Sequence, residues 1–210
     1  MSFTKAIIFD LGGVIINLDQ DRTLRAFKRL GVDLDQINEN HPIFKEFEIG
    51  KIDADGFRNQ IRAISRKKIA DNVINEAWNK MLLDIPAERI TLLSQLRKQY
   101  RILLLSNTNT IHMDGIYQYT SAEFGAGSFE NMFDKIYLSH EIGMRKPDAD
   151  TYKFILSENQ LMPHESIFID DSKINCRGAE EAGIRAIWAK EPLDTWIIQE
   201  LKNMQQLQMN

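Results

Sequence analysis

Short runs of aliphatic and β-branched residues alternate along the chain with longer segments in which apolar positions recur every three or four residues. The runs are residues 5–10, 101–106, 135–139, 166–170 and 184–188. Each run is short enough for a buried strand, and the segments between them, such as residues 87–99, have helical spacing. Strands that alternate with helices form parallel sheets, so the pattern predicts an α/β fold with a Rossmann-like parallel sheet covered by helices.

The interval between the first two runs differs from the rest, because it contains no convincing strand and several amphipathic helical patterns. Helices are predicted there at residues 20–30, 41–47, 53–64 and 71–80. Asp53 and Asp71 suit helix N-caps, and Gly31 suits the end of the first helix. We therefore expect an inserted helical domain beside a Rossmann-like core. The two domains would comprise residues 17–85 for the insertion, and residues 1–16 with 86–210 for the core.

Composition and charge narrow the classes of partner. The chain has 210 residues, of which 43% are hydrophobic, enough for one main core and a modest second domain. A net charge of −4 gives no broad basic field of the kind that binds nucleic acid or an anionic membrane. The single cysteine, Cys176, cannot form an intramolecular disulfide, and no apolar run approaches the roughly 20 residues of a membrane span. We expect a cytoplasmic protein whose partner is a small molecule, with its oligomeric state left open.

Residues with strong chemical character follow four of the five predicted strands. They are Asp10 after the first strand, Ser106 and Asn107 at the end of the second, Lys146 after the third, and Asp170 and Asp171 at the end of the fourth. The carboxyl ends of parallel strands meet at one edge of the sheet, where ligands bind. We therefore expect an acid, a hydroxyl with an amide, a cation and an acidic pair to converge at that edge.

This set of side chains suits phosphoryl transfer, in which positioning and the neutralisation of negative charge supply most of the catalysis. A carboxylate that attacks a phosphate dianion is repelled unless a hard cation lies between them, and Mg²⁺ is usually held by carboxylates, phosphate and water. The predicted Mg²⁺ ligands are Asp10, Asp171 and the backbone carbonyl of Gly12, with Asp170 acting through water. The predicted phosphate ligands are Lys146, Ser106 and Asn107.

Four segments carry these residues: Phe-Asp-Leu-Gly-Gly-Val from residue 9, Leu-Ser-Asn-Thr-Asn from residue 105, Gly-Met-Arg-Lys-Pro from residue 143, and Ile-Asp-Asp-Ser from residue 169. Together they resemble the four ordered motifs of the haloacid dehalogenase-like (HAD) superfamily. Their spelling is similar to a bacterial branch with glucose 1-phosphate phosphatases, and to the phosphatase domain of mammalian soluble epoxide hydrolase. The resemblance implies that Asp10 is a nucleophile that becomes phosphorylated, that Mg²⁺ is the cofactor, and that the insertion is the family's helical cap domain.

One position departs from the family pattern. Most phosphatases of this superfamily carry a second aspartate two residues after the nucleophile, as general acid and base, whereas this chain has Gly12. A well-placed acid or base contributes roughly 10²- to 10⁴-fold in rate. Its absence predicts a slower enzyme, a substitute such as Asp19 or His112, or a substrate whose leaving group needs little help. Glucose 1-phosphate fits the last case, because an anomeric oxygen is a better leaving group than an ordinary alcohol.

The choice of substrate and reaction leaves alternatives open. Within the insertion, the candidates for contact with the substrate are Asp19, Arg22, Phe44 and Glu48. The main prediction is a Mg²⁺-dependent phosphatase of a small phosphorylated metabolite. A 2-haloacid dehalogenase, in which the aspartate attacks carbon, is permitted by Gly12 but opposed by the extra negative charge of Asp170 and Asp171. A non-catalytic binding protein with the same fold is the remaining alternative.

Overall fold

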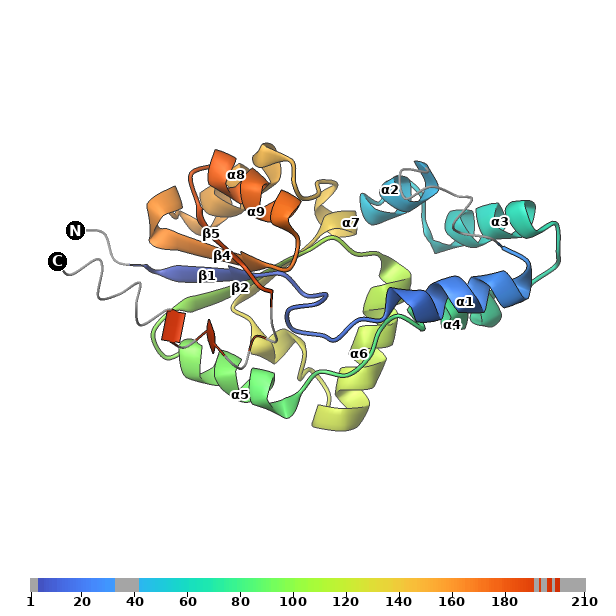
Figure 1. Cartoon of the computed structure of the whole chain (residues 1–210), viewed down its shortest axis with the longest axis horizontal. Helices are drawn as coiled ribbons and strands as arrows, with labels where there is room; N and C mark the ends of the chain where they lie inside the picture. Colours follow the sequence, from blue (N-terminus) through green and yellow to red (C-terminus); the bar gives the residue numbers. More distant parts are fainter. Residues whose placement is uncertain (1–3, 33–41, 191–192, 194–195, 198, 201–210) are drawn as a thin grey trace.

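The computed structural model describes residues 4–32, 42–190, 193, 196–197 and 199–200 of the chain. Five strands form one parallel sheet in the order β3-β2-β1-β4-β5 (Figure 1). Their bounds are β1 Ala6–Phe9, β2 Arg101–Ser106, β3 Lys135–Leu138, β4 Ser166–Asp170 and β5 Arg185–Trp188. Because β1 lies between β2 and β4, the residues that follow these three strands come together at one edge of the sheet.

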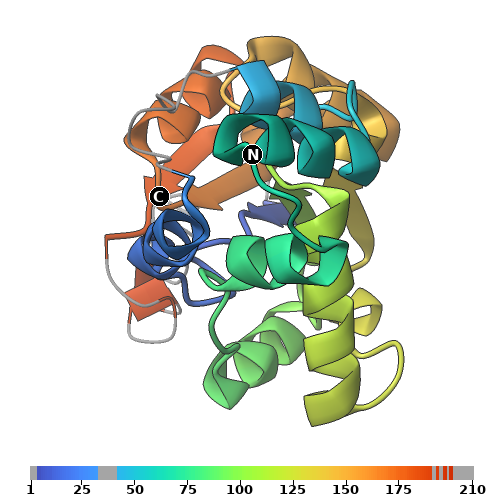
Figure 2. The ribbon, with the colours of Figure 1, turned by 90° about the vertical axis from the view of Figure 1, so that its right-hand side faces the viewer.

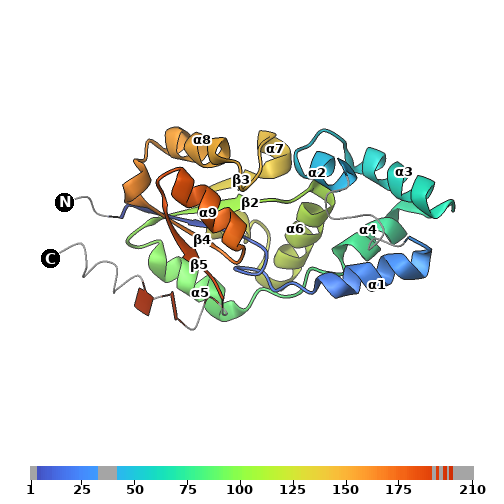
Figure 3. The ribbon, with the colours of Figure 1, turned by 45° about the horizontal axis from the view of Figure 1, so that its top comes forward.

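Helices cover both faces of the sheet (Figures 1 and 3). They are α5 Ala87–Leu96, α6 Thr110–Phe124, α7 Ser139–Ile142, α8 Ala149–Asn159 and α9 Lys173–Glu181, with short 3₁₀ helices at Glu130–Met132 and Pro163–Glu165. Alternate strand residues point to opposite faces. Ile7 therefore packs in one apolar cluster with Leu92 of α5. Its neighbour Ile8 packs in a second cluster with Tyr152 of α8. The parallel sheet with helices on both faces confirms the predicted α/β class.

Among the described residues, four helices form the insertion between β1 and α5: α1 Gln20–Leu30, α2 Pro42–Glu48, α3 Ala54–Ser65 and α4 Asp71–Asn79. They lie beyond the carboxyl edge of the sheet, beside α6 and α7 (Figures 1 and 2). Their buried side chains form a separate apolar cluster that includes Phe27 and Phe57, and α6 contributes Ile111 to it. The chain enters and leaves this region side by side, where Leu18 and Leu82 form an antiparallel bridge.

The helix ends within the insertion follow most of the sequence signals. Helix α1 begins and ends at the predicted residues, and Gly31 stops it in the left-handed conformation with φ 84°. The side chain of Asp53 caps α3 by accepting a hydrogen bond from a backbone amide of the first turn. The predicted cap at Asp71 is wrong by one residue, because Ala70 is the N-cap. The Asp71 carboxylate instead pairs with Arg62 of the neighbouring helix α3.

Other predicted bounds differ by a few residues. Helix α5 ends at Leu96 rather than at residue 99, because the amides of Gln99 and Tyr100 both bond to the Leu96 carbonyl and tighten the chain into a turn before β2. Strand β5 begins at Arg185, one residue later than expected. The predicted start of the second inserted helix, at His41, lies outside the described residues. Helices α6 and α8 have no counterpart among the ranges predicted above.

Candidate active site

An ammonium group and three carboxylates gather at the carboxyl edge of the sheet. Asp10 directly follows β1 and Asp170 ends β4, and both side chains are buried. The Lys146 Nζ atom donates to Asp10 Oδ1 at 2.6 Å and to Asp170 Oδ2 at 2.7 Å. Asp10, Asp170 and Asp171 each present a carboxylate oxygen within 4.8 Å of the others, a spacing that could hold a metal ion. The fold thus brings together four of the predicted site residues.

Burial and crowding of like charges determine the protonation of this cluster. Burial raises the pKa of Asp10 to about 7; Lys146 opposes the rise, while the charges of Asp170 and Asp171 add to it. Burial also raises the pKa of Asp171, with a further contribution from Asp170. Burial disfavours the charge on Lys146, but the neighbouring carboxylates outweigh it and raise the pKa of its ammonium. One buried ammonium does not balance three carboxylates, whereas a divalent cation beside it would.

The two adjacent acids before α9, Asp170 and Asp171, differ in their hydrogen bonds and in their exposure. Asp170 Oδ1 accepts hydrogen bonds from the Ser172 amide at 2.8 Å and from Asn175 Nδ2 at 3.0 Å, while its Oδ2 accepts from Lys146. Asp171 is exposed, and its backbone carbonyl accepts a hydrogen bond from Trp188 Nε1 at 2.8 Å. Both oxygens of Asp170 therefore already have donors, and the more accessible carboxylate of the pair is that of Asp171.

Two neighbouring glycines after Asp10 have different reasons for being glycine. Gly13 has φ +72°, and a Cβ atom added to it would lie 2.2 Å from Asp171 Oδ2. A Cβ atom on Gly12 would meet only the tip of the Leu18 side chain, at 2.7 Å, and a flexible leucine can rotate away. The backbone thus requires glycine at position 13, whereas position 12 has room for a side chain.

The loop after β2 is tied to its neighbours residue by residue. Ser106 is buried at the end of the strand. The Asn107 side chain donates to the carbonyl of Lys146 and accepts from its amide, both at 2.9 Å. The hydroxyl of Ser139 accepts from the Thr108 amide at 2.9 Å and donates to its carbonyl at 3.0 Å. The side-chain amide of Asn107 is therefore occupied by the backbone of Lys146, and it contributes to the site by fixing that residue.

Both substitutes considered for an acid at position 12 are engaged elsewhere. Asp19 forms an ion pair with Arg22, with Asp19 Oδ2 and Arg22 Nε 3.3 Å apart. His112 is buried against α4, where its Nδ1 lies 2.9 Å from Asn79 Oδ1. Burial lowers the pKa of His112 to about 3, so the imidazole is neutral at physiological pH and has no proton to give as a general acid.

Residues 7–189 match the family model of the haloacid dehalogenase-like hydrolases. The chain belongs to this family. The D-ribitol-5-phosphate phosphatase of Bacteroides thetaiotaomicron is 32% identical to it over 196 residues, which cover 90% of this chain and 94% of that protein. A HAD-family enzyme of the same organism, crystallised with magnesium and inorganic phosphate, has a TM-score of 0.86 at 37% identity and covers 93% of this chain and 98% of that one. A HAD-like hydrolase from Porphyromonas gingivalis has a TM-score of 0.87 at 28% identity, over 97% of this chain and 98% of that one.

These matches confirm the resemblance and the fold class that the motifs of this HAD hydrolase predict. They also support the expectation of a phosphomonoester hydrolase, because a relative named as a phosphatase aligns over nearly the whole chain. Within the described parts of the chain, no helix has the length and apolar character needed to cross a membrane.

Of the four predicted specificity residues of this HAD hydrolase, Glu48 contacts a motif segment directly. Its Oε2 accepts from Arg145 Nη2 at 2.8 Å and from Arg145 Nε at 3.0 Å, and Arg145 immediately precedes Lys146. Burial raises the pKa of Glu48, and the charges of Arg145 and Lys146 oppose that rise. Phe44 instead stacks on Trp78 in the apolar cluster of the insertion, with ring centroids 5.5 Å apart.

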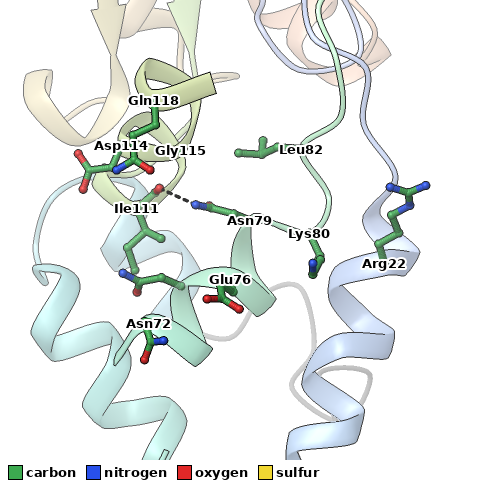
Figure 4. A pocket seen from close by; sticks show the side chains of 11 residues that line it. Arg22, Asn72, Glu76, Asn79, Lys80, Leu82, Ile111, Asp114, Gly115 and Gln118 are labelled. Atoms are coloured by element: carbon green, nitrogen blue, oxygen red, sulfur yellow. Dashed lines mark hydrogen bonds between the residues drawn. The ribbon is translucent and has the colours of Figure 1, made fainter. Parts of the chain in front are cut away.

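The remaining specificity candidates, Asp19 and Arg22, pair with each other at the start of α1. Arg22 lines a groove of about 520 Å³ between α1, α4 and α6, together with Lys80 and Glu76 (Figure 4). Of the described side chains that line this groove, none belongs to the cluster around Asp10. Arg22 therefore lines a groove that is separate from the cluster around Asp10.

Sequence reasoning missed Asn175 and Trp188, which bond to members of the cluster, and Arg145, which pairs with Glu48. A usable signal existed for Trp188, because it ends the strand next to β4 and pairs in register with Asp170. Asn175 lies in the first turn of α9, five residues after Asp170, and its reach back to that carboxylate depends on the turn between strand and helix.

Proposed function

We propose that this HAD hydrolase is a Mg²⁺-dependent phosphatase of a small phosphorylated metabolite, with Asp10 as the nucleophile. The observation that carries the proposal is the Lys146 ammonium between Asp10 and Asp170 at the edge of the sheet. An oxygen of Asp171 lies within 4.8 Å of an oxygen of each of these two carboxylates. A buried carboxylate beside a fixed cation and further acids suits a substrate that is itself anionic and arrives with a metal.

The residues present fit a magnesium ion. Mg²⁺ prefers carboxylate and carbonyl oxygens, and the crowding that raises the pKa of Asp10 would be relieved by a dication. We propose Asp10, Asp171 and the backbone carbonyl of Gly12 as direct ligands. Asp170 would act through water, because hydrogen bonds already occupy both of its oxygens. Bound Mg²⁺ would neutralise charge on the attacking carboxylate and on the phosphate. The related enzyme crystallised with magnesium and phosphate supports this choice.

In the first step, an oxygen of Asp10 attacks the phosphorus in line with the bond to the leaving oxygen. The new O–P bond makes an aspartyl-phosphate, and the electron pair of the broken bond goes to the leaving oxygen, which takes up a proton. Lys146, 2.6 Å from Asp10 Oδ1, holds the attacking carboxylate and would donate to a phosphate oxygen. The buried Ser106 hydroxyl would donate to another.

In the second step, water attacks the phosphorus of the aspartyl-phosphate, the electron pair returns to Asp10, and inorganic phosphate leaves. Both steps move a proton that a second aspartate handles in most of the superfamily. Gly12 has no side chain to do this. We therefore expect the rate to depend strongly on the basicity of the leaving oxygen.

We propose a phosphorylated sugar or polyol as the substrate class. The relative from Bacteroides thetaiotaomicron is named for a polyol phosphate. The paired Glu48 and Arg145 supply acceptors and donors that hydroxyl groups can bind, next to the phosphate-binding Lys146. Glucose 1-phosphate remains a candidate on the strength of its leaving group. In this proposal residues 17–85 are the cap that contacts the organic part, and residues 1–16 and 86–210 are the catalytic core.

A panel of phosphomonoesters tests the proposal. D-Ribitol 5-phosphate, glucose 1-phosphate and glucose 6-phosphate are assayed for phosphate release at matched concentrations, with Mg²⁺ and with excess chelator. We expect turnover only with Mg²⁺, none by Asp10→Asn, and wild-type turnover by the exposed control Asp150→Asn. Turnover that survives the chelator or the Asp10 substitution would exclude the proposed mechanism. Chloride release from 2-chloropropionate without phosphatase activity would favour the dehalogenase.

A further inference from the structure

The loop of residues 106–109, which we call the phosphate loop, is anchored from both the core and the insertion. Two anchors, at Asn107 and Thr108, come from the segments that follow β3. The third anchor comes from α4 of the insertion, where Trp78 Nε1 donates a hydrogen bond to Asn109 Oδ1 at 3.3 Å. A residue of the insertion therefore holds the loop that, under the proposed function, receives the phosphate.

Asn109 joins the phosphate loop to helix α6. It is the N-cap of α6, and the same Oδ1 atom accepts a hydrogen bond from the His112 amide at 3.0 Å. Its backbone is extended, so the side chain that makes these two bonds also determines how the chain turns from the loop into the helix. A shift of the Trp78 indole would consequently be passed to the backbone of the phosphate loop.

Aromatic packing fixes the orientation of the Trp78 indole. The His112 ring lies 4.9 Å away and is within 7° of parallel to it. Three phenylalanine rings of the insertion also contact it: Phe27, Phe44 and Phe57. The indole N–H is thus held in a direction that the surrounding rings determine, and it donates to Asn109 from a rigid support.

Asn79, the next residue of α4, forms hydrogen bonds with helix α6. Asn79 Nδ2 donates to the Ile111 carbonyl at 3.1 Å, as Figure 4 shows. Its Oδ1 is therefore the acceptor for His112 Nδ1 at 2.9 Å. A Cβ atom on Gly115 would lie 2.6 Å from Asn79 Nδ2, so glycine at this position lets α4 approach α6 closely. The contact between α4 and the start of α6 is consequently both polar and tightly packed.

We propose that Trp78 is a positioning residue for the phosphate loop, so that helix α4 of the insertion helps to bind the phosphate itself and not only the organic part of the substrate. The inference rests on the proposed function. It predicts that loss of the indole N–H weakens phosphate binding equally for all substrates. A change in the relative preference between substrates is not expected, because the phosphoryl group is common to them.

Two variants separate the hydrogen bond from the packing. Trp78→Phe removes the N–H and keeps an aromatic ring. Ile61→Val, the matched control, loosens the same cluster at a side chain that is not one of the rings against Trp78. Calorimetric titration with inorganic phosphate in the presence of Mg²⁺ measures binding without turnover. We expect Trp78→Phe to weaken phosphate binding about 2- to 10-fold, the effect of one neutral hydrogen bond. Its ratio of kcat/KM between two substrates should be unchanged, and Ile61→Val should lower Tm without weakening phosphate binding.

Unchanged phosphate affinity in a folded Trp78→Phe protein would overturn the inference, as would an equal loss in Ile61→Val. If Trp78→Phe does not fold, Gly115→Ala takes its place, because the added methyl group pushes Asn79 away from α6. It should also weaken phosphate binding, and unchanged binding would again overturn the inference. Weakened phosphate binding in these variants, together with no phosphate release from any ester by the wild type, would refute the proposed function while supporting the positioning role.

Discussion

The carboxyl edge of the sheet and the inserted helices are built on different physical chemistry. At the edge, buried charges of opposite sign are in direct contact, because Lys146 lies between Asp10 and Asp170. The described interior of the insertion is apolar and contains several aromatic rings, and its Glu48 pairs with Arg145 of a motif segment. A buried charge left without its partner is far more costly than a lost apolar contact. Changes at the edge should therefore stop the reaction, whereas changes in the insertion should alter affinity and preference.

The largest effect is expected from Lys146→Met. Lys146 is 1% exposed, and its removal leaves two buried carboxylates without their common cation. Turnover should fall by about 10³-fold or more, and the free energy of unfolding by about 3–5 kcal/mol. Phosphate release and urea denaturation measure the two effects. Lys153→Met, at an exposed ion pair, serves as the control and should change neither. Turnover within tenfold of the wild type would contradict the claim that changes at the carboxyl edge stop the reaction.

The pH dependence of the metal-free protein is the next prediction. The pKa of Asp10 is raised from 3.8 to about 7, so the folded chain holds a proton that the unfolded chain releases. The contribution of Asp10 to stability is complete below the lower pKa and is lost as the pH rises through the higher one. We expect a loss of roughly 2–4 kcal/mol. Urea denaturation of wild type and Asp10→Asn from acid to neutral pH measures it. An equal loss in both proteins would show that Asp10 does not titrate in this way.

Gly12→Asp should raise the activity, by a smaller factor than the one by which Lys146→Met lowers it. The backbone accepts a side chain there if the tip of Leu18 rotates, and the new carboxylate could act as the missing acid and base. Substrates with ordinary alcohol leaving groups should turn over about 10- to 100-fold faster, and glucose 1-phosphate much less so. Gly12→Asn, with the same shape and no ionisable group, is the matched control. Equal rates for the two variants would mean that the acid is not what limits the enzyme.

Glu48→Gln should have the smallest effect. It keeps the size of the side chain but weakens the pair with Arg145 across the boundary between α2 and the motif segment. We expect KM to rise about 3- to 10-fold for hydroxyl-rich substrates, with kcat nearly unchanged. Steady-state kinetics on two substrates of different hydroxyl content detect this, with Glu46→Gln of the same helix as the control. A fall in kcat that is equal for both substrates would show that Glu48 acts in the chemical step and not in the selection of the substrate.

The edge could be predicted from sequence more completely than the contacts that support it. Strand order brings residues after β1 and β4 together whatever the loops do, so Asp10, Asp170 and Asp171 could be assigned to one site from their positions alone. The Trp78–Asn109 hydrogen bond joins residues 31 positions apart, one on α4 and the other at the N-cap of α6, and neither periodicity nor spacing marks it. It depends on how closely α4 approaches α6, which is a property of tertiary packing.

Asn107 is a second example of a residue whose hydrogen-bond partner could not be predicted from the sequence. It follows β2, and its side chain bonds to the backbone of Lys146 at the carboxyl edge of the sheet, while its predicted contact with phosphate stays a prediction. Its partner, the backbone of Lys146, could not be read from the sequence, because the two residues lie 39 positions apart and meet only when β2 and β3 pair. Local patterns predict which strand ends converge, whereas individual hydrogen bonds depend on the geometry of the loops between them.

Direct detection of a phosphorylated Asp10 tests the central claim. Excess enzyme is mixed with Mg²⁺ and a substrate from the panel, quenched in acid within a single turnover, and mapped by peptide mass spectrometry after borohydride reduction. We predict a phosphoryl group on Asp10 before reduction and homoserine at position 10 after it, both absent from Asp10→Asn. A phosphoryl group on another residue, or consumption of substrate with no modification of Asp10 at any quench time, would contradict the assignment of Asp10 as the nucleophile.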